Sequence, residues 1–205
     1  MKAGNQLTIQ SFTNIINITQ KTMTENIKNL NELSLKYPLT DKGPVKADGT
    51  PGHNYTETYG YHFESLRDRD LKILEIGFGG GDSLKLWKEY FTKAEIYCID
   101  NNLSRIEEYN YIPDDRIKIF YGDQSNSSSL MESCSQMGVD KFDIIIDDGS
   151  HIDSHIMTTF HTLFEKYLSP GGLYFVEDYL NTLTYVSDGI HSIDYKNELT
   201  TIIKK

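Results

Sequence analysis

Cysteine is scarce in this sequence, and so are long apolar runs. The chain has two cysteines among 205 residues, Cys98 and Cys134, and they form neither a C-x-x-C pair nor a disulfide framework. We expect inert thiols in a reducing compartment. No apolar run approaches the roughly 18 residues that a membrane helix needs, and the opening MKAGNQLTIQ lacks the apolar core of a secretory signal. The sequence therefore predicts a cytoplasmic protein without a membrane partner.

Basic side chains are outnumbered as well. Twenty lysines and arginines stand against thirty aspartates and glutamates, which gives a formal charge of −10. This charge repels phosphate backbones and anionic lipids, so we expect no nucleic-acid partner. The chain does have 38% hydrophobic and 12% aromatic residues, which is enough for one domain with a sizeable core.

The first part of the chain predicts a helix followed by a long loop. Apolar residues between positions 11 and 37 share one helical stripe that ends at Pro38, namely Ile16, Met23, Ile27, Leu30 and Leu33. We expect residues 1–39 to form a helical extension that packs on the main domain, with a subunit contact as the alternative. Residues 40–63 are rich in Gly, Pro, Asp and Thr, which predicts a loop leading into a short helix.

From residue 71 onwards, short apolar runs alternate with amphipathic or polar stretches. The runs are LKILEIG (71–77), AEIYCID (94–100), RIKIFYGD (116–123), FDIIIDD (142–148) and GLYFVED (172–178). Strands that are apolar on both faces and separated by helices are typical of a parallel sheet covered on each side. A helix after residue 150 is indicated by Ile152, Ile156, Phe160, Leu163 and Tyr167, and SPGG at 169–172 should end it. The expected fold class is α/β, with a doubly wound, mostly parallel sheet.

A glycine-rich loop joins the first of these strands to a helix that begins near Ser83. In LEIGFGGGDS (74–83), glycines at 77, 79, 80 and 81 let the backbone turn sharply and approach a ligand closely, although a plain tight turn is an alternative. The dinucleotide pattern G-x-G-x-x-G would need glycine at position 82. Asp82 stands there instead, and a carboxylate is unfavourable beside a pyrophosphate. A nicotinamide-dependent oxidoreductase is therefore the less favoured function.

Acidic residues close the next two strands at the edge where open parallel sheets bind ligands. Asp100 ends the second strand and can accept both hydroxyls of a ribose, and Asp123 follows the third strand. Each of them alone is compatible with an ordinary turn or helix cap. Their register with Glu75 on the first strand argues against coincidence.

The fourth strand runs directly into two carboxylates and a histidine, Asp147, Asp148 and His151. Ser150 and Asp153 fit an S-x-x-D capping box, which predicts that His151 lies near the first helical position. The alternative is that both carboxylates only cap the helix.

Further carboxylates follow the fifth strand, at Glu177 and Asp178. Adjacent strand ends then offer the hard oxygen ligands that Mg²⁺ prefers. Zinc is disfavoured, because the pair His151 and His155 has no cysteine or H-E-x-x-H beside it.

The pattern acidic-x-G-x-G-x-G, from Glu75 to Gly81, resembles the class I S-adenosylmethionine-dependent methyltransferases. The longer set DKG, HNYTETY, LEIGFGGGDSLKLWKEYF, YGDQS, IDDGSH and SPGGLYFVEDY, between residues 40 and 180, resembles the macrocin O-methyltransferase-like sugar methyltransferases. This resemblance implies a Rossmann-like fold, with residues 40–205 as the S-adenosylmethionine-binding domain. It also implies transfer of a methyl group, with Mg²⁺, to a sugar hydroxyl of a natural product or surface-glycan precursor.

The resemblance further implies roles for single residues. His151 would be the general base, Asp148 and Asp178 the metal-binding carboxylates, and Asp147 a supporting acid. The cofactor-binding residues would be Glu75, Gly77, Gly79, Gly81, Ser83, Asp100, Asp123 and Gln124. The loop before the sheet could close over the cofactor through His53, Tyr55 or Glu57, with plain packing as an even alternative.

The end of the sequence departs from this family, whose sheet has seven strands. Residues 179–205 show no convincing hairpin, so we expect the last strands to be short or missing. An uncovered fifth strand would be an apolar edge that favours a homo-oligomer, unless residues 180–203 cover it. A descendant of the fold that serves assembly without catalysis is therefore a further alternative.

Overall fold

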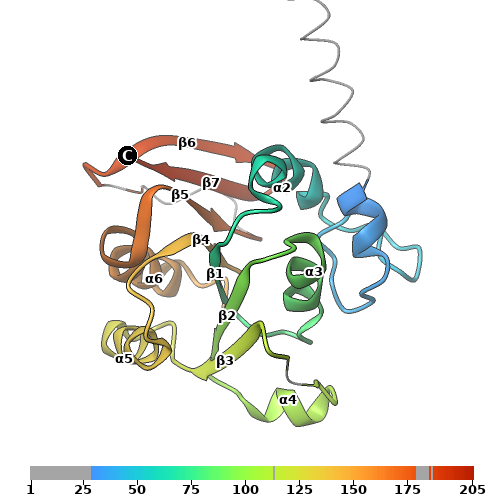
Figure 1. Ribbon diagram of the computed structural model, residues 1–205, viewed down its shortest axis with the longest axis horizontal. Helices are drawn as coiled ribbons and strands as arrows, with labels where there is room; N and C mark the ends of the chain where they lie inside the picture. The colour runs from blue at the N-terminus through green and yellow to red at the C-terminus, as the bar shows by residue number, and fades with distance from the viewer. Residues whose placement is uncertain (1–28, 113, 179–184, 186) are drawn as a thin grey trace, which may run out of the picture.

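The computed structural model describes residues 29–112, 114–178, 185 and 187–205 (Figure 1). Its strands are β1 (Lys72–Ile76), β2 (Glu95–Asp100), β3 (Ile117–Tyr121), β4 (Phe142–Asp147), β5 (Leu168–Val176), β6 (Ile190–Lys196) and β7 (Leu199–Lys204). Its helices are α2 (Tyr55–Phe63), the short 3-10 helix η1 (Glu64–Leu66), α3 (Asp82–Tyr90), α4 (Ser104–Glu108), α5 (Ser127–Met137) and α6 (Asp153–Tyr167). Each of the five apolar runs contains a strand, and the helix expected after residue 150 is α6.

The strands form one seven-stranded sheet in the order β3-β2-β1-β4-β5-β7-β6. β1 to β5 are mutually parallel, whereas β7 is antiparallel to β5 and β6 is antiparallel to β7. The order reverses between β1 and β4, which is where open α/β sheets bind ligands. The predicted doubly wound, mostly parallel sheet is confirmed, and the chain has the class I methyltransferase fold.

Alternate residues of the strands face two apolar clusters, one on each side of the sheet. On β4, Ile144 and Ile146 join the cluster covered by α2 and α3, and Ile145 joins the one covered by α5 and α6 (Figure 1). Burial on both faces explains why the strands read as nearly continuous apolar runs. None of the helices in the described part of the chain has the length and apolar character that a membrane span requires.

The N-terminal helix predicted over residues 11–37 is only partly described. Residues 29–34 are helical, and Leu30 and Leu33 are buried in the same cluster as Trp87 of α3. Ile16, Met23 and Ile27 lie outside the described residues. Within the described part, the apolar stripe therefore packs on the main domain.

The expectation of short or missing C-terminal strands is wrong. β6 and β7 form a hairpin, and β7 pairs along β5, from Leu173 opposite Ile203 to Val176 opposite Thr200. The alternative that residues from this stretch cover the fifth strand is confirmed. β5 is therefore not an edge, and the reason to expect self-association through it disappears.

The hairpin escaped sequence analysis for two physical reasons. Its turn is Asn197-Glu198, with φ of 52° and 63°, instead of the usual Asn-Gly for a turn with two positive φ angles. In addition, β6 has no buried residue along its length, so it shows no alternation of apolar and polar side chains.

Candidate functional site

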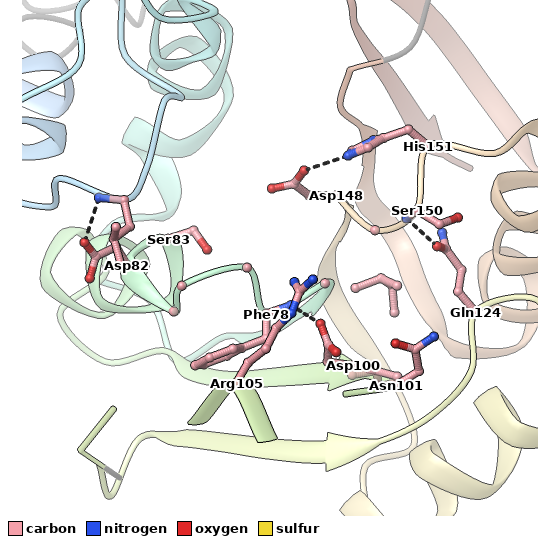
Figure 2. Close-up of a pocket in the computed structure, with 18 of the residues that line it drawn as sticks. Phe78, Asp82, Ser83, Asp100, Asn101, Arg105, Gln124, Asp148, Ser150 and His151 are labelled. Carbon is pink, nitrogen blue, oxygen red and sulfur yellow. Dashed lines mark hydrogen bonds and ion pairs between the residues drawn. The ribbon is translucent and has the colours of Figure 1, made fainter. Parts of the chain in front are cut away.

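A cavity of about 440 Å³ opens at the carboxyl ends of β1, β2 and β4, at the reversal of strand order (Figure 2). This volume is in the range of small-molecule and cofactor sites. Nine of the predicted site residues line it together: Gly77, Gly79, Gly81, Ser83, Asp100, Asp123, Gln124, Asp148 and His151. Glu75 and Asp178 are not among the lining residues.

The glycine loop has the backbone geometry that requires glycine. Gly77 has a φ of 99°, and a Cβ added to it would clash with the carbonyl oxygen of Asp148, so the loop lies directly against the end of β4. Gly79, with a φ of 52°, has no atom within 4 Å of an added Cβ. A side chain at Gly79 would therefore enter the open cavity.

Asp100 is held by the backbone around it. One carboxylate oxygen accepts a hydrogen bond from the N–H of Phe78 in the glycine loop at 2.8 Å (Figure 2). The other accepts from the N–H of Asn102 at 2.7 Å. Each oxygen keeps one free lone pair, because a carboxylate offers about four acceptor positions. Asp100 can therefore still accept two hydroxyl groups of a ligand while its orientation is fixed.

Gln124 links the cavity to a buried acid beneath it. Its Nε2 donates to Oδ1 of Asp147, and its Oε1 accepts from the N–H of Ser150 at 2.9 Å. Burial, and then the charge of Asp148, raises the pKa of Asp147 to about 8. Asp147 thus lies under the site, in the supporting place expected for it, and sets the orientation of the Gln124 amide.

Glu75 lies beneath the glycine loop, fully buried. Its Oε2 accepts from the indole N–H of Trp87 at 2.8 Å, and its Oε1 lies 3.6 Å from Nζ of Lys42. Burial raises the pKa of Glu75 to about 7 against the opposing effect of Lys42. Direct binding of a cofactor by Glu75 stays a prediction.

Lys42 lines the cavity and was missed by sequence analysis. Its side chain is 2% exposed, and Nζ lies 2.7 Å from Oδ2 of Asp148 and 2.6 Å from Oε2 of Glu177. Together with Glu75, three carboxylates from the ends of β1, β4 and β5 surround this ammonium group. Burial opposes the charge of Lys42, but Asp148, Glu177 and Glu75 outweigh it and hold its pKa well above the usual range.

His151 and Asp148 lie together at the edge of the cavity, 3.9 Å apart between Nε2 and Oδ1 (Figure 2). Oδ2 of Asp178 lies 3.8 Å from the same nitrogen. His151 has a φ of 55° and Asp178 a φ of 54°, a left-handed conformation that is uncommon outside glycine and clusters at functional sites. The three predicted catalytic and metal-binding residues are therefore brought together.

The capping box predicted for Ser150 and Asp153 is wrong. α6 begins at Asp153 with Ile152 as its cap residue, and no side chain caps its first turn. Ser150 Oγ instead lies 2.9 Å from Nδ1 of His155. His151 therefore precedes the helix, in a strained loop at the end of β4.

The loop before the sheet contacts the strand-end acids. Tyr55 is fully buried and donates from its hydroxyl to Oδ1 of Asp178 at 2.7 Å, and His53 Nδ1 lies 3.3 Å from the same oxygen. Neither residue lines the cavity, nor does Glu57, which forms an ion pair with Lys196 at 2.9 Å. In this structure His53 and Tyr55 support Asp178, whereas Thr40, Asp41 and Lys42 at the start of the same segment line the cavity.

The donor set suits a divalent cation. One ligand atom from each of Asp148, His151 and Asp178 falls within 4.8 Å of the other two, and a second group of the same kind joins His53, Asp178 and Glu198. Carboxylate oxygens are the ligands that Mg²⁺ prefers. The first group borders the cavity, so it is the better candidate to act on a molecule bound there.

Comparison with known proteins identifies relatives of this chain. Demethylmacrocin O-methyltransferase of Streptomyces fradiae is 37% identical over 180 residues, which are 84% of this chain and 42% of that protein. The chain is a relative of the macrocin-type sugar O-methyltransferases. A rhamnosyl tetracenomycin-C 2'-O-methyltransferase of Streptomyces olivaceus is 41% identical over 133 residues, or 62% of this chain and 33% of the relative. No family model matches the chain.

The solved structures agree with these sugar O-methyltransferase relatives. The MycE methyltransferase of the mycinamycin pathway, in complex with Mg, SAH and mycinamycin VI, matches with a TM-score of 0.68 and 28% identity over 85% of this chain and 54% of that one. The chain thus spans about half the length of this structure, and less than half of the curated relatives.

Proposed function

We propose that this chain is an O-methyltransferase that uses S-adenosylmethionine and Mg²⁺ to methylate a sugar hydroxyl of a natural product or surface-glycan precursor. The observation that carries the proposal is the placement of two sets of residues side by side. The glycine loop and Asp100 border one end of the cavity, and Asp148 and His151 border the other, with Asp178 beside them. The similarity to sugar O-methyltransferases supports the same reaction.

Each end of the cavity has its own task in this reaction. S-adenosylmethionine supplies the methyl group, and a divalent cation held by Asp148 and Asp178 supplies the positive charge that makes a nearby hydroxyl more acidic. His151, 39% exposed, faces the opening and takes the hydroxyl proton at Nε2 as general base. The two carboxylates lie 3.9 and 3.8 Å from this nitrogen.

The acceptor class comes from the relatives and from the position of the base. The relatives are named as O-methyltransferases of demethylmacrocin, of a rhamnosyl tetracenomycin-C and of mycinamicin VI. A sugar hydroxyl is a weak acid, so it needs both a base and a cation, and this site offers candidates for both. We further propose that the protein acts in the cytoplasm, where its two free cysteines would stay reduced. The predicted homo-oligomer stays a prediction.

The nicotinamide alternative is weakened by the position of Asp82. Its Oδ2 accepts from the N–H of Leu39 at 3.0 Å, so a carboxylate stands in the cavity wall at the start of α3. That place would be occupied by a pyrophosphate in a dinucleotide-binding fold. The retention of Asp148, His151 and Asp178 in one cluster argues against a purely structural descendant.

Calorimetric titration tests the cofactor. The chain should bind S-adenosylhomocysteine more tightly than NAD, and Gly79→Val should abolish binding because its side chain would enter the cavity from a positive φ. Gly138→Val is the matched control, because Gly138 also has a positive φ and open space but caps α5 away from the cavity. Equal or tighter binding of NAD would favour the oxidoreductase.

Methyl transfer to a panel of deoxysugar glycosides tests the other end of the site. His151→Ala should lower turnover by about 10² to 10⁴ fold, and Asp148→Asn should lower it with only partial rescue by added Mg²⁺. Both variants should still bind S-adenosylhomocysteine, and His161→Ala, an exposed histidine on α6, is the control. Full turnover in chelator would show that the reaction needs no metal, and full turnover by His151→Ala would show that His151 is not the general base.

A further inference from the structure

The most unusual charge in the described part of the chain is Lys42. It comes from the loop before the sheet, yet its ammonium group is buried among Glu75, Asp148 and Glu177, at 3.6, 2.7 and 2.6 Å. An isolated buried ammonium or carboxylate is strongly unfavourable, so these four groups depend on one another. A lysine that only anchored a loop would need one partner and would not need burial.

The carboxylates have few other partners. Glu177 also accepts from the hydroxyl of Tyr59, and Glu75 from the indole of Trp87. These donors carry no charge, so Lys42 is the basic side chain that approaches all three acids among the described residues. Without it, three acids from neighbouring strand ends would face one another at close range.

Asp148 connects this buried group to the candidate cation site. Its Oδ2 contacts Lys42, while its Oδ1 faces Nε2 of His151. The same carboxylate therefore belongs to the lysine and to the proposed metal ligands at once. A cation that binds to Asp148 must share it with the ammonium group or displace that group.

We propose that Lys42 is a built-in counter-cation, which holds Asp148 and Glu177 in place when no divalent ion is bound and competes with a divalent ion for Asp148. This inference rests on the proposed metal site. Lys42 is a positioning residue in this role, because it touches the acids and takes no part in proton or methyl transfer. Its presence lets the strand ends fold before the metal arrives, and it limits how tightly the metal binds.

Removal of the charge should therefore have two opposite effects. Lys42→Met keeps most of the length of the side chain but leaves the three acids without a cation, so thermal stability in EDTA should fall. A divalent ion should then replace the missing charge. We expect the dissociation constant for Mn²⁺ to fall about tenfold or more, because the ion no longer meets a fixed positive charge a few ångströms away.

The experiment compares Mn²⁺ affinity by calorimetry, and melting temperature in EDTA and in MgCl₂, for wild type and Lys42→Met. The rise in melting temperature caused by the cation should be several times larger in the variant, since a ligand of the folded state stabilises it by linkage. Lys85→Met is the control: Lys85 pairs with Asp82 close to the cavity but contacts none of the three acids, so its loss should leave Mn²⁺ affinity unchanged.

The outcomes separate this inference from the proposed function. Equal or weaker Mn²⁺ binding by Lys42→Met, with normal binding by wild type, overturns the role of Lys42 and leaves the metal site intact. Binding by the variant alone supports Lys42 and contradicts the metal-dependent function of the wild type, and binding by neither overturns both. A Lys42→Met protein that folds only with divalent ions supports the inference, and one that stays unfolded in saturating Mn²⁺ overturns it.

Discussion

Asp147 makes the pH dependence of stability a test of how the end of β4 is built. It is 1% exposed, and burial, followed by the charge of Asp148, raises its pKa to about 8. In an unfolded chain an aspartate ionises near pH 3.9. Between these two values the unfolded chain loses a proton that the folded chain keeps, so this group makes the folded state less stable as pH rises.

The variant Asp147→Asn removes this titration and keeps an acceptor for Nε2 of Gln124. A difference of one bound proton changes the free energy of unfolding by about 1.4 kcal/mol per pH unit, so from pH 5 to pH 7 the wild type should lose about 2.7 kcal/mol relative to the variant. For a chain of this size, 1 kcal/mol corresponds to roughly 2–4 °C in melting temperature. The gap between the two proteins should therefore widen by about 5–11 °C.

Scanning calorimetry at pH 5, 6 and 7 measures this gap, with EDTA present so that no cation binds to Asp148. Asp143→Asn, near the other end of β4, controls for the substitution itself, since Asp143 is partly exposed and accepts from the N–H of Lys72. Melting temperatures of wild type and Asp147→Asn that differ by the same amount at pH 5, 6 and 7 would refute the reasoning. They would mean that Asp147 is ionised in the folded protein, or that it is reached by water.

Three further substitutions test the geometry. Gly77→Ala should lower the free energy of unfolding by about 1–3 kcal/mol and weaken S-adenosylhomocysteine binding, because its Cβ would push the glycine loop away from Asp148. Calorimetry that shows neither change would contradict this. Glu198→Gly should raise stability by about 0.5–1 kcal/mol, because it creates an Asn-Gly turn at a positive φ; an unchanged melting temperature would argue against that turn. Tyr55→Phe should lower the free energy of unfolding by about 1–2 kcal/mol and lower turnover without affecting cofactor binding, because the Tyr55 hydroxyl donates to the Asp178 carboxylate and accepts from the Asp178 N–H. A variant with normal turnover would make the contact purely structural.

The parts of the structure that could be predicted are those encoded by neighbouring residues. The apolar runs of β1 to β5 locate the strands because each strand is buried on both faces, and the glycines at 77, 79 and 81 mark a turn whose positive φ angles need them. The acids Asp100 and Asp148 follow as strand-end residues, because parallel strands bring their carboxyl ends to one edge. Local pattern was sufficient for these features.

The parts that were missed depend on contacts between distant residues. Lys42 is one lysine in a polar loop, and its burial exists only because Asp148 and Glu177, 106 and 135 residues further on, fold around it. β6 gave no signal because its side chains stay exposed and its stability comes from pairing with β7. The capping box at Ser150 failed because its hydroxyl pairs with the side chain of His155 instead of a backbone N–H in the first turn of α6.

These distant contacts also explain why the segment from residue 40 to residue 63 precedes the sheet in sequence but belongs to the site in space. Lys42, Tyr55 and Tyr59 each place a donor on a strand-end acid, so Asp148, Asp178 and Glu177 all depend on this one segment. The glycine loop and Asp100 need none of these contacts, because their own backbone holds them. Loss of the Tyr55 and Tyr59 hydroxyls should therefore disturb the acids and the base beside them, while the glycine loop and Asp100 keep their positions. Turnover would then be lost while cofactor binding is kept, which is the behaviour expected if cofactor binding and acceptor activation are distinct tasks.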